Sequence, residues 1–339
     1  MKIKGVISES KRRGVIRKHI GAACAILAAA LAVGSCSKRA AGDIDISSHT
    51  RMQFGVQLAG SSTGQWTTNG AAAHSAVSRS ELITTSSFYE SFGVFGYSSG
   101  TSASYNMMNN AEVTENESGK WAPTKVCYWP GSGKVWFYAY APYDADLSCT
   151  FEDGSLALDY SVDSDVESQQ DFLVAKSAIF DGDYFSTVPL TFDHALTGIR
   201  FVTGSEIREG TIKNIRLKNV YRSGNFSFDD GVWTASDITD FEQTVDKEVD
   251  GTSDVAITSD SQTFLMMPQQ LPADAAIEID FEMPNGKQQT FSAPVGSSIW
   301  SMGKIITYRI AISGVEMEVE FSIVDWEEVS TGGSSWEIE

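Results

Sequence analysis

The sequence is poor in histidine, in cysteine and in positive charge. Its 339 residues include only four histidines and four cysteines, and none of them has the paired spacing of a zinc site. Lysine and arginine total 25 against 44 aspartates and glutamates, which gives a formal net charge of −19. Nucleic acids and anionic lipids bind basic patches, so this balance argues against both as partners. We therefore expect an acidic protein that does not bind nucleic acid.

Long apolar runs and long stretches of helical period are also missing. The apolar run over residues 20–33 is shorter than the roughly 20 residues that span a bilayer. It follows a basic segment, residues 1–19, in which seven lysines and arginines face one glutamate. A basic start, a short apolar run and small residues at its end are typical of a secretory signal. Residues 1–35 are therefore predicted to be a signal peptide.

The end of this signal, Val33-Gly34-Ser35-Cys36, resembles the lipobox of bacterial lipoproteins. The resemblance implies cleavage between Ser35 and Cys36 and a lipid on the Cys36 thiol. Several acyl chains on one cysteine anchor a protein stably in a membrane, whereas a single chain does not. Without residues 1–35 the net charge becomes about −25, counted over the printed sequence.

Two cysteines remain once Cys24 in the signal and the lipidated Cys36 are set aside. Cys127 and Cys149 could form a disulfide in an oxidising periplasm. They could equally be two small buried apolar residues. Both alternatives stay open at the level of sequence.

Short segments of alternating apolar and polar residues dominate the rest of the chain. Period two with one polar face is typical of half-buried antiparallel strands. The segment 276–283 leads into Asn285-Gly286, a strong hairpin signal. The clearest alternating segments are 52–58, 155–162, 276–283 and 315–323. The pattern predicts an all-β protein.

Composition suggests how the chain is divided. The Gly/Ser/Thr/Ala-rich segment 60–78 is expected to be an exposed, flexible linker. Some 300 residues after the signal exceed the usual size of a single core, so two domains are expected. The predicted parts are a tether, an N-terminal domain that includes the linker, and a C-terminal domain, over residues 36–51, 52–185 and 186–339.

The catalytic and ligand-binding motifs that the sequence partly matches lack a required residue or the required structural context. The G-x-S-x-G match at 60–64 lies in the linker and not at a strand-to-helix turn. The segment 130–135 lacks the first glycine of a phosphate-binding loop, and 163–167 lacks the glycine and distal glutamate of a calcium loop. His194 is interpreted as a hydrogen-bonded histidine at the junction of a strand and a turn. We expect no enzyme activity, no cofactor and no metal.

The order of landmarks along the chain carries a resemblance. "YWP…VWFYAYAP" within 119–143 is followed by "F-x-HAL-x-x-I-x-F" within 188–201, and then by "SMGKIITYRIAI" at 301–312. This succession is similar to the fimbrillin family of Bacteroidota, from about residue 52 to 326. The resemblance implies two tandem transthyretin-like β-sandwiches in a lipoprotein of the outer membrane and cell surface. It also implies a structural or anchor subunit of adhesive fimbriae, with other subunits as partners.

Strand exchange is the assembly mode that this resemblance suggests. Segment 52–58 is predicted to be a removable first strand that another subunit's strand replaces. The family's stalk subunits are matured by an arginine-specific protease, and Arg79 is predicted to be the site because cutting at Arg51 would leave the first strand in place. Segment 315–323 is either the donor strand or the fixed last strand of its domain. The competing interpretation is a surface lipoprotein that binds glycans or host proteins through aromatic side chains of its loops. Exposed, coplanar tryptophans at one end of a domain would favour it.

Overall fold

The computed structural model describes residues 50–59, 88–100, 104–152 and 155–326. Within these residues the chain is built from strands, joined by turns and by two short 3-10 segments, η2 (Val166–Ser168) and η3 (Asp260–Gln262). The prediction of an all-β protein is confirmed. In this described part of the chain, no helix is long and apolar enough to cross a bilayer.

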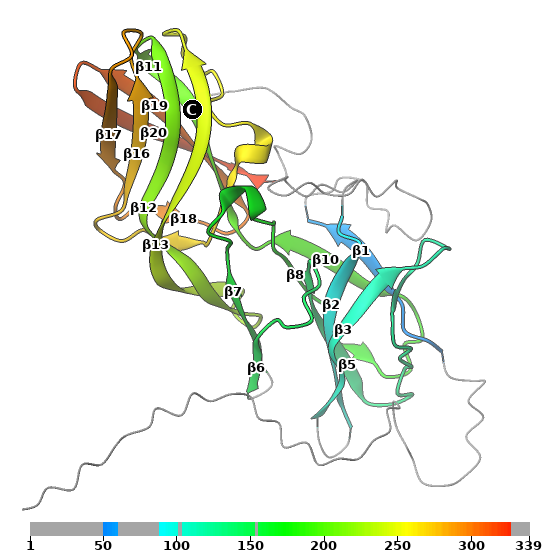
Figure 1. The fold of residues 1–339 in the computed structure, drawn as a ribbon. Helices are drawn as coiled ribbons and strands as arrows, with labels where there is room; N and C mark the ends of the chain where they lie inside the picture. The colour runs from blue at the N-terminus through cyan, green and yellow to red at the C-terminus, as the bar shows by residue number, and fades with distance from the viewer. Residues whose placement is uncertain (1–49, 60–87, 101–103, 153–154, 327–339) are drawn as a thin grey trace, which may run out of the picture. The chain divides into compact units, whose positions relative to one another are not determined.

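The first sheet closes on itself. Among its strands, Figure 1 labels β1, β2, β3, β5, β8 and β10. Its strands follow the order β2-β3-β4-β1-β10-β8-β5-β9, and β2 also pairs with β5. That extra pairing joins β2, the first strand of the row, to β5 and so closes a ring of seven strands, while β9 pairs with the start of β5 outside this ring. The strands are β1 (Phe54–Leu58), β2 (Ser91–Ser99), β3 (Ser104–Glu115), β4 (Trp121–Pro123), β5 (Lys134–Ala141), β8 (Leu173–Lys176), β9 (Phe180–Asp181) and β10 (Val188–His194). Closure protects the strands because it removes free backbone edges.

Alternation along the strands separates two hydrophobic clusters. On β5, Val135, Phe137 and Ala139 belong to the cluster that β1 and β10 also line. Tyr138 and Tyr140, at the intervening positions, belong to the second cluster. Successive side chains of a strand point to opposite faces, so one aromatic strand serves both cores.

The strands that follow β10, together with the earlier strands β6 and β7, form two further sheets and a short strand pair. The four-stranded sheet has the order β14-β11-β19-β20, and the six-stranded sheet has the order β17-β16-β12-β7-β6, with β13 also paired to β12. Strands β15 and β18 pair separately. Their bounds are β6 (Cys149–Glu152), β7 (Ser155–Ser161), β11 (Thr197–Ile207), β12 (Gly210–Ser227), β13 (Val232–Val249), β14 (Phe264–Met266), β15 (Gln269–Gln270), β16 (Ala276–Glu282), β17 (Gln288–Pro294), β18 (Ile299–Trp300), β19 (Lys304–Ser313) and β20 (Glu316–Asp325).

Strand pairing runs across residue 185 in both directions. β10 lies after it in the sequence yet pairs with β1 in the closed sheet. β7 lies before it yet pairs with β12, from Ser161↔Ser223 to Ala157↔Ser227. The division into domains 52–185 and 186–339, and their transthyretin-like character, stay predictions.

A predicted turn and a predicted alternating segment have different outcomes in the structure. The turn at Asn285-Gly286 joins β16 to β17, with Gly286 at φ 78°, in the region that favours glycine. β20 buries Met317 but leaves Phe321 and Ile323 half exposed, because it is the edge strand of its sheet. β20 also pairs with β19 at ten positions, from Lys304↔Asp325 to Ser313↔Glu316, which favours a fixed last strand over a donor.

Candidate strand-exchange site

Strand β1 is one member of the closed sheet and is supplied by a segment remote in sequence from its neighbours. It pairs in parallel with β10 at five positions, from Phe54↔Val188 to Leu58↔Phe192. On its other side it pairs with β4 in antiparallel fashion at Phe54↔Trp121. Removal of β1 would therefore open the closed sheet and leave the backbone edges of β10 and β4 unpaired.

The side chains of this segment fill the interior of the closed sheet. Met52, Phe54, Val56 and Leu58 are each 5% exposed or less, which confirms the predicted apolar face. The Phe54 ring meets Phe137 edge to face, with ring centroids 5.4 Å apart. Burial of such side chains stabilises a fold by roughly 1.5–3 kcal/mol each. The segment is thus held firmly, and only a strand with comparable side chains could replace it.

The residues just before β1 are also paired. Arg51 forms an antiparallel bridge with Tyr128, and the Met52 amide donates to the Cys127 carbonyl at 2.9 Å. The Trp129 amide donates to the Thr50 carbonyl at 3.2 Å. Proteases cut backbone that can be drawn into their active site, so this pairing shields the bond after Arg51. Arg79, Ser35, Cys36 and the linker 60–78 lie outside the described residues.

The two remaining cysteines lie in different surroundings. Cys127 is buried among the side chains of the closed sheet. Cys149, at the start of β6, is half-buried against the second cluster. The disulfide between them stays a prediction.

His194 has the hydrogen bond that its position in the sequence suggested. Its Nδ1 lies 2.6 Å from Asp171 Oδ2, and both side chains are buried. An ionised carboxylate only accepts hydrogen bonds, so the imidazole is the donor. The ring stacks on Trp326, with centroids 4.5 Å apart. Asp171 and Trp326 had no signal in the sequence, because they lie 23 and 132 positions from His194.

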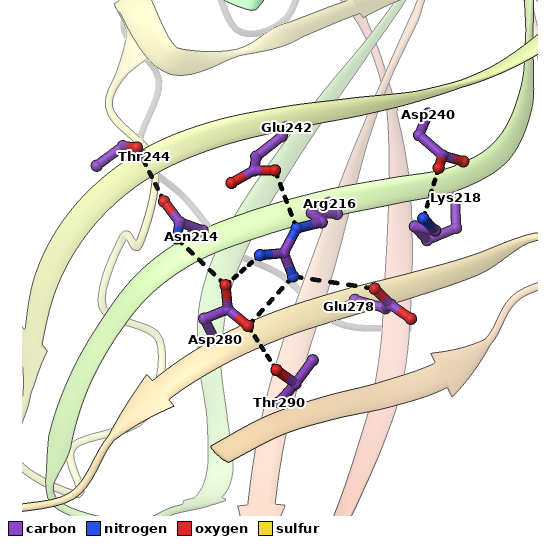
Figure 2. A network of polar contacts seen from close by, with 9 residues as sticks. All are labelled: Asn214, Arg216, Lys218, Asp240, Glu242, Thr244, Glu278, Asp280 and Thr290. Carbon is purple, nitrogen blue, oxygen red and sulfur yellow. Dashed lines mark hydrogen bonds and ion pairs between the residues drawn. The ribbon is translucent and has the colours of Figure 1, made fainter. Parts of the chain in front are cut away.

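A polar network covers the outer face of the six-stranded sheet (Figure 2). Arg216 on β12 donates to Glu242 on β13 at 3.0 Å and through both terminal nitrogens to Asp280 on β16. Asp280 also accepts from Thr290 on β17 at 2.6 Å and from Asn214 at 3.2 Å. The network ties four strands together. Within the described part of the chain, no group of three or more His, Cys, Asp or Glu residues is placed to hold a metal ion.

The Arg216 guanidinium lowers the pKa of Asp280 to about 2, with help from the Thr290 and Asn214 hydrogen bonds. A carboxyl group whose pKa is lower in the folded state stabilises the fold at pH values above its unfolded pKa of 3.8. This stabilisation is lost as the pH falls toward 2. We expect Asp280→Asn to lower the free energy of unfolding at pH 7 by about 1 kcal/mol, given partial solvent screening. Urea unfolding from pH 7 down to pH 2 would measure it.

The matched control for this prediction is Asp183→Asn, which removes an exposed carboxylate outside the network. The control should unfold like the wild type at every pH. Between pH 4 and 2 the Asp280→Asn protein should lose less stability than the wild type. An equal loss of stability between pH 4 and 2 in the wild type and in the Asp280→Asn protein would contradict the lowered pKa of Asp280.

Comparisons with known proteins identify a matching family and solved structures of similar fold. The sequence profile of the fimbrillin-like family matches residues 83–326, beginning after β1, whereas the resemblance in the sequence began near residue 52. A fimbrial protein from Bacteroides vulgatus is 16% identical, covers 81% of this chain and 99% of its own, and superposes with a TM-score of 0.55. A candidate cell adhesion protein from Bacteroides ovatus is 16% identical, with 81% and 96% coverage and a TM-score of 0.53.

A third solved structure, a candidate cell adhesion protein from Bacteroides uniformis, is 18% identical, with 83% and 99% coverage and a TM-score of 0.50. At such low identity these likenesses concern the fold alone. A comparison with curated proteins found no match. The profile match covers well over half of the sequence, and so the chain belongs to the fimbrillin-like family.

Proposed function

We propose that this protein is a structural or accessory subunit of adhesive cell-surface fimbriae, assembled by strand exchange at β1. The observation that carries the proposal is the place of β1, a short buried strand that completes an otherwise continuous closed sheet. Membership of the fimbrillin-like family supports the same role. The proposal gives the protein a structural role, with no reaction and no cofactor.

In the proposed assembly, cleavage after Arg79 separates β1 and everything before it from the rest of the chain. The cut strand stays bound through its backbone pairs and its buried side chains until a strand of another subunit takes its place. Such strand addition uses main-chain hydrogen bonds for affinity and alternate side chains for specificity. Repeated head to tail, the contact gives an open filament.

The proposed anchor is the lipid on Cys36, which would hold the uncut protein in the outer membrane. Replacing Cys36 by alanine should abolish lipid attachment and leave an unprocessed or soluble precursor. Metabolic labelling with a radioactive fatty acid measures the attachment. A label that persists in the Cys36→Ala protein would rule the anchor out.

Treatment of the purified precursor with an arginine-specific protease tests the proposed maturation. We expect cleavage after Arg79 and none after Arg51, whose backbone is paired, and polymers only after the cut. Arg79→Lys is the matched control, since it keeps the charge but removes the cleavage site. Resistance at Arg79, cleavage at Arg51, or cleavage that unfolds the protein without assembly would defeat the proposal.

Exposed, coplanar tryptophans would favour the competing interpretation, in which loop aromatics bind glycans or host proteins. Within the described residues every tryptophan is buried or half-buried: Trp121, Trp129, Trp136, Trp233, Trp300 and Trp326. No observation on these side chains therefore favours a tryptophan-lined glycan site.

A further inference from the structure

A group of apolar side chains is exposed between β8 and β10. Ile179, Tyr184 and Phe185 are 68%, 42% and 44% exposed, respectively. The Tyr184 ring packs on Phe180 and on the buried Trp129, with centroids 4.6 and 5.5 Å apart. We call Ile179, Phe180, Tyr184 and Phe185 the aromatic patch. Several large apolar side chains exposed on one short loop favour an interaction site.

The loop that carries the aromatic patch is built to a fixed shape. Its Gly182 amide donates to the Gly133 carbonyl at 2.8 Å, and the Gly131 amide donates to the Gly182 carbonyl at 2.9 Å. A β-carbon on Gly182 would lie 2.1 Å from the Ser132 carbonyl oxygen, so the two loops approach as closely as glycine allows. Asp181 pairs with Lys134 at 2.6 Å. The patch is thus presented by a braced loop.

Phe185 adds a local strain. Its φ of 51° lies in the left-handed region, which bulky residues rarely adopt. Strained residues of this kind persist where the surrounding structure imposes them, and they cluster at functional sites. Here the strain accompanies an aromatic ring that is nearly half exposed.

We call the space between β10 and β4, which β1 fills, the β1 groove. The aromatic patch lies at the end of this groove where β1 begins. Trp129, on which Tyr184 packs, donates its amide to the Thr50 carbonyl, four residues before β1. Phe185 stands three residues before Val188, the partner of Phe54 in the first position of β1. Any strand that replaces β1 must therefore pass beside this patch.

We propose that the aromatic patch is a docking surface for the body of a second fimbrial subunit, the one whose strand occupies the β1 groove. This inference rests on the proposed function and extends it from a strand contact to a contact between folded surfaces. The patch supplies apolar area next to the groove, where the incoming subunit is held by its own strand. Tyrosine is one of the residues most often decisive at protein interfaces.

A lipid surface is the less favoured occupant. The patch loop carries Asp181 and Asp183, and the net charge without the signal is about −25, counted from the sequence. Anionic headgroups repel such a surface, whereas membrane-binding surfaces are enriched in lysine and arginine. The chemistry therefore favours a protein partner.

The test uses the full mature chain carrying Tyr184→Ser and Phe185→Asn, since asparagine tolerates the left-handed backbone. The matched control carries Val232→Thr and Ile238→Thr on β13, where each side chain is 53% exposed. Each protein is cleaved with the arginine-specific protease, and polymer length is followed by light scattering. Capture of a fluorescent peptide with the sequence of residues 52–58 is measured in parallel, as is sedimentation with phosphatidylglycerol-containing vesicles.

We expect the patch variant to keep the wild-type peptide capture, which reports an intact strand-binding site, but to polymerise roughly tenfold more weakly, while the control is unchanged. A patch variant that polymerises like the wild type overturns the docking surface and leaves strand exchange intact. A wild type that neither captures the peptide nor polymerises overturns the proposed function, and the docking surface with it. Vesicle binding that only the patch variant loses, with normal polymers, assigns the patch to lipid instead.

Discussion

Replacing Phe54 by alanine is expected to lower the free energy of unfolding by about 3–5 kcal/mol, the usual cost of removing a buried phenylalanine. The ring lies inside the closed sheet, where it contacts the Phe92 and Phe137 rings edge to face. Urea unfolding of the uncut chain measures the change. Phe321→Ala is the control, because that ring is half exposed on an edge strand and its loss should cost far less.

The same substitution has a functional consequence. After cleavage β1 is held only by non-covalent contacts, so loss of the Phe54 ring should speed its release by a factor that follows the lost stability. Size-exclusion chromatography of the cleaved protein would show the wild type retaining the segment and the Phe54→Ala protein losing it. Equal retention by both proteins would mean that β1 is not held by its side chains.

Replacing Asp171 by alanine is expected to cost about 1–3 kcal/mol of stability, the penalty for leaving a buried hydrogen-bond donor without its acceptor. His194 would keep its buried Nδ1–H but lose the acceptor 2.6 Å away, with the Trp326 ring stacked against its face. The Tyr89 hydroxyl, which donates to the Asp171 backbone carbonyl at 2.6 Å, would keep its bond. Thermal and urea unfolding measure the loss.

A matched control exists in Asp181→Ala, which breaks an ion pair of the same 2.6 Å length between exposed side chains. That change should cost at most about 1 kcal/mol, since solvent screens exposed pairs. Asp171→Asn, which keeps an acceptor, should fall between the two. A loss for Asp171→Ala no larger than for Asp181→Ala would contradict a structural role of the buried pair.

Local patterns in the sequence determined several features of this protein. The alternation of residues 52–58 and 276–283 decided which side chains are buried, because neighbouring residues of a strand face opposite sides whatever the partner strand is. Asn285-Gly286 placed a turn, because glycine accepts the backbone angle that this turn needs. The position of His194 at the junction of a strand and a turn likewise indicates its hydrogen bond.

Only the tertiary structure decided how these strands combine. Every strand offers the same backbone donors and acceptors, so the sequence of β1 does not specify its parallel pairing with β10. The sequences of β2 and β5 likewise do not predict that these two strands pair and close the sheet. Asp171 and Trp326 reach His194 only through folding. The exposure of Tyr184 and Phe185 likewise depends on which surfaces the other strands cover. Alternation of apolar and polar residues does not predict which surfaces those are.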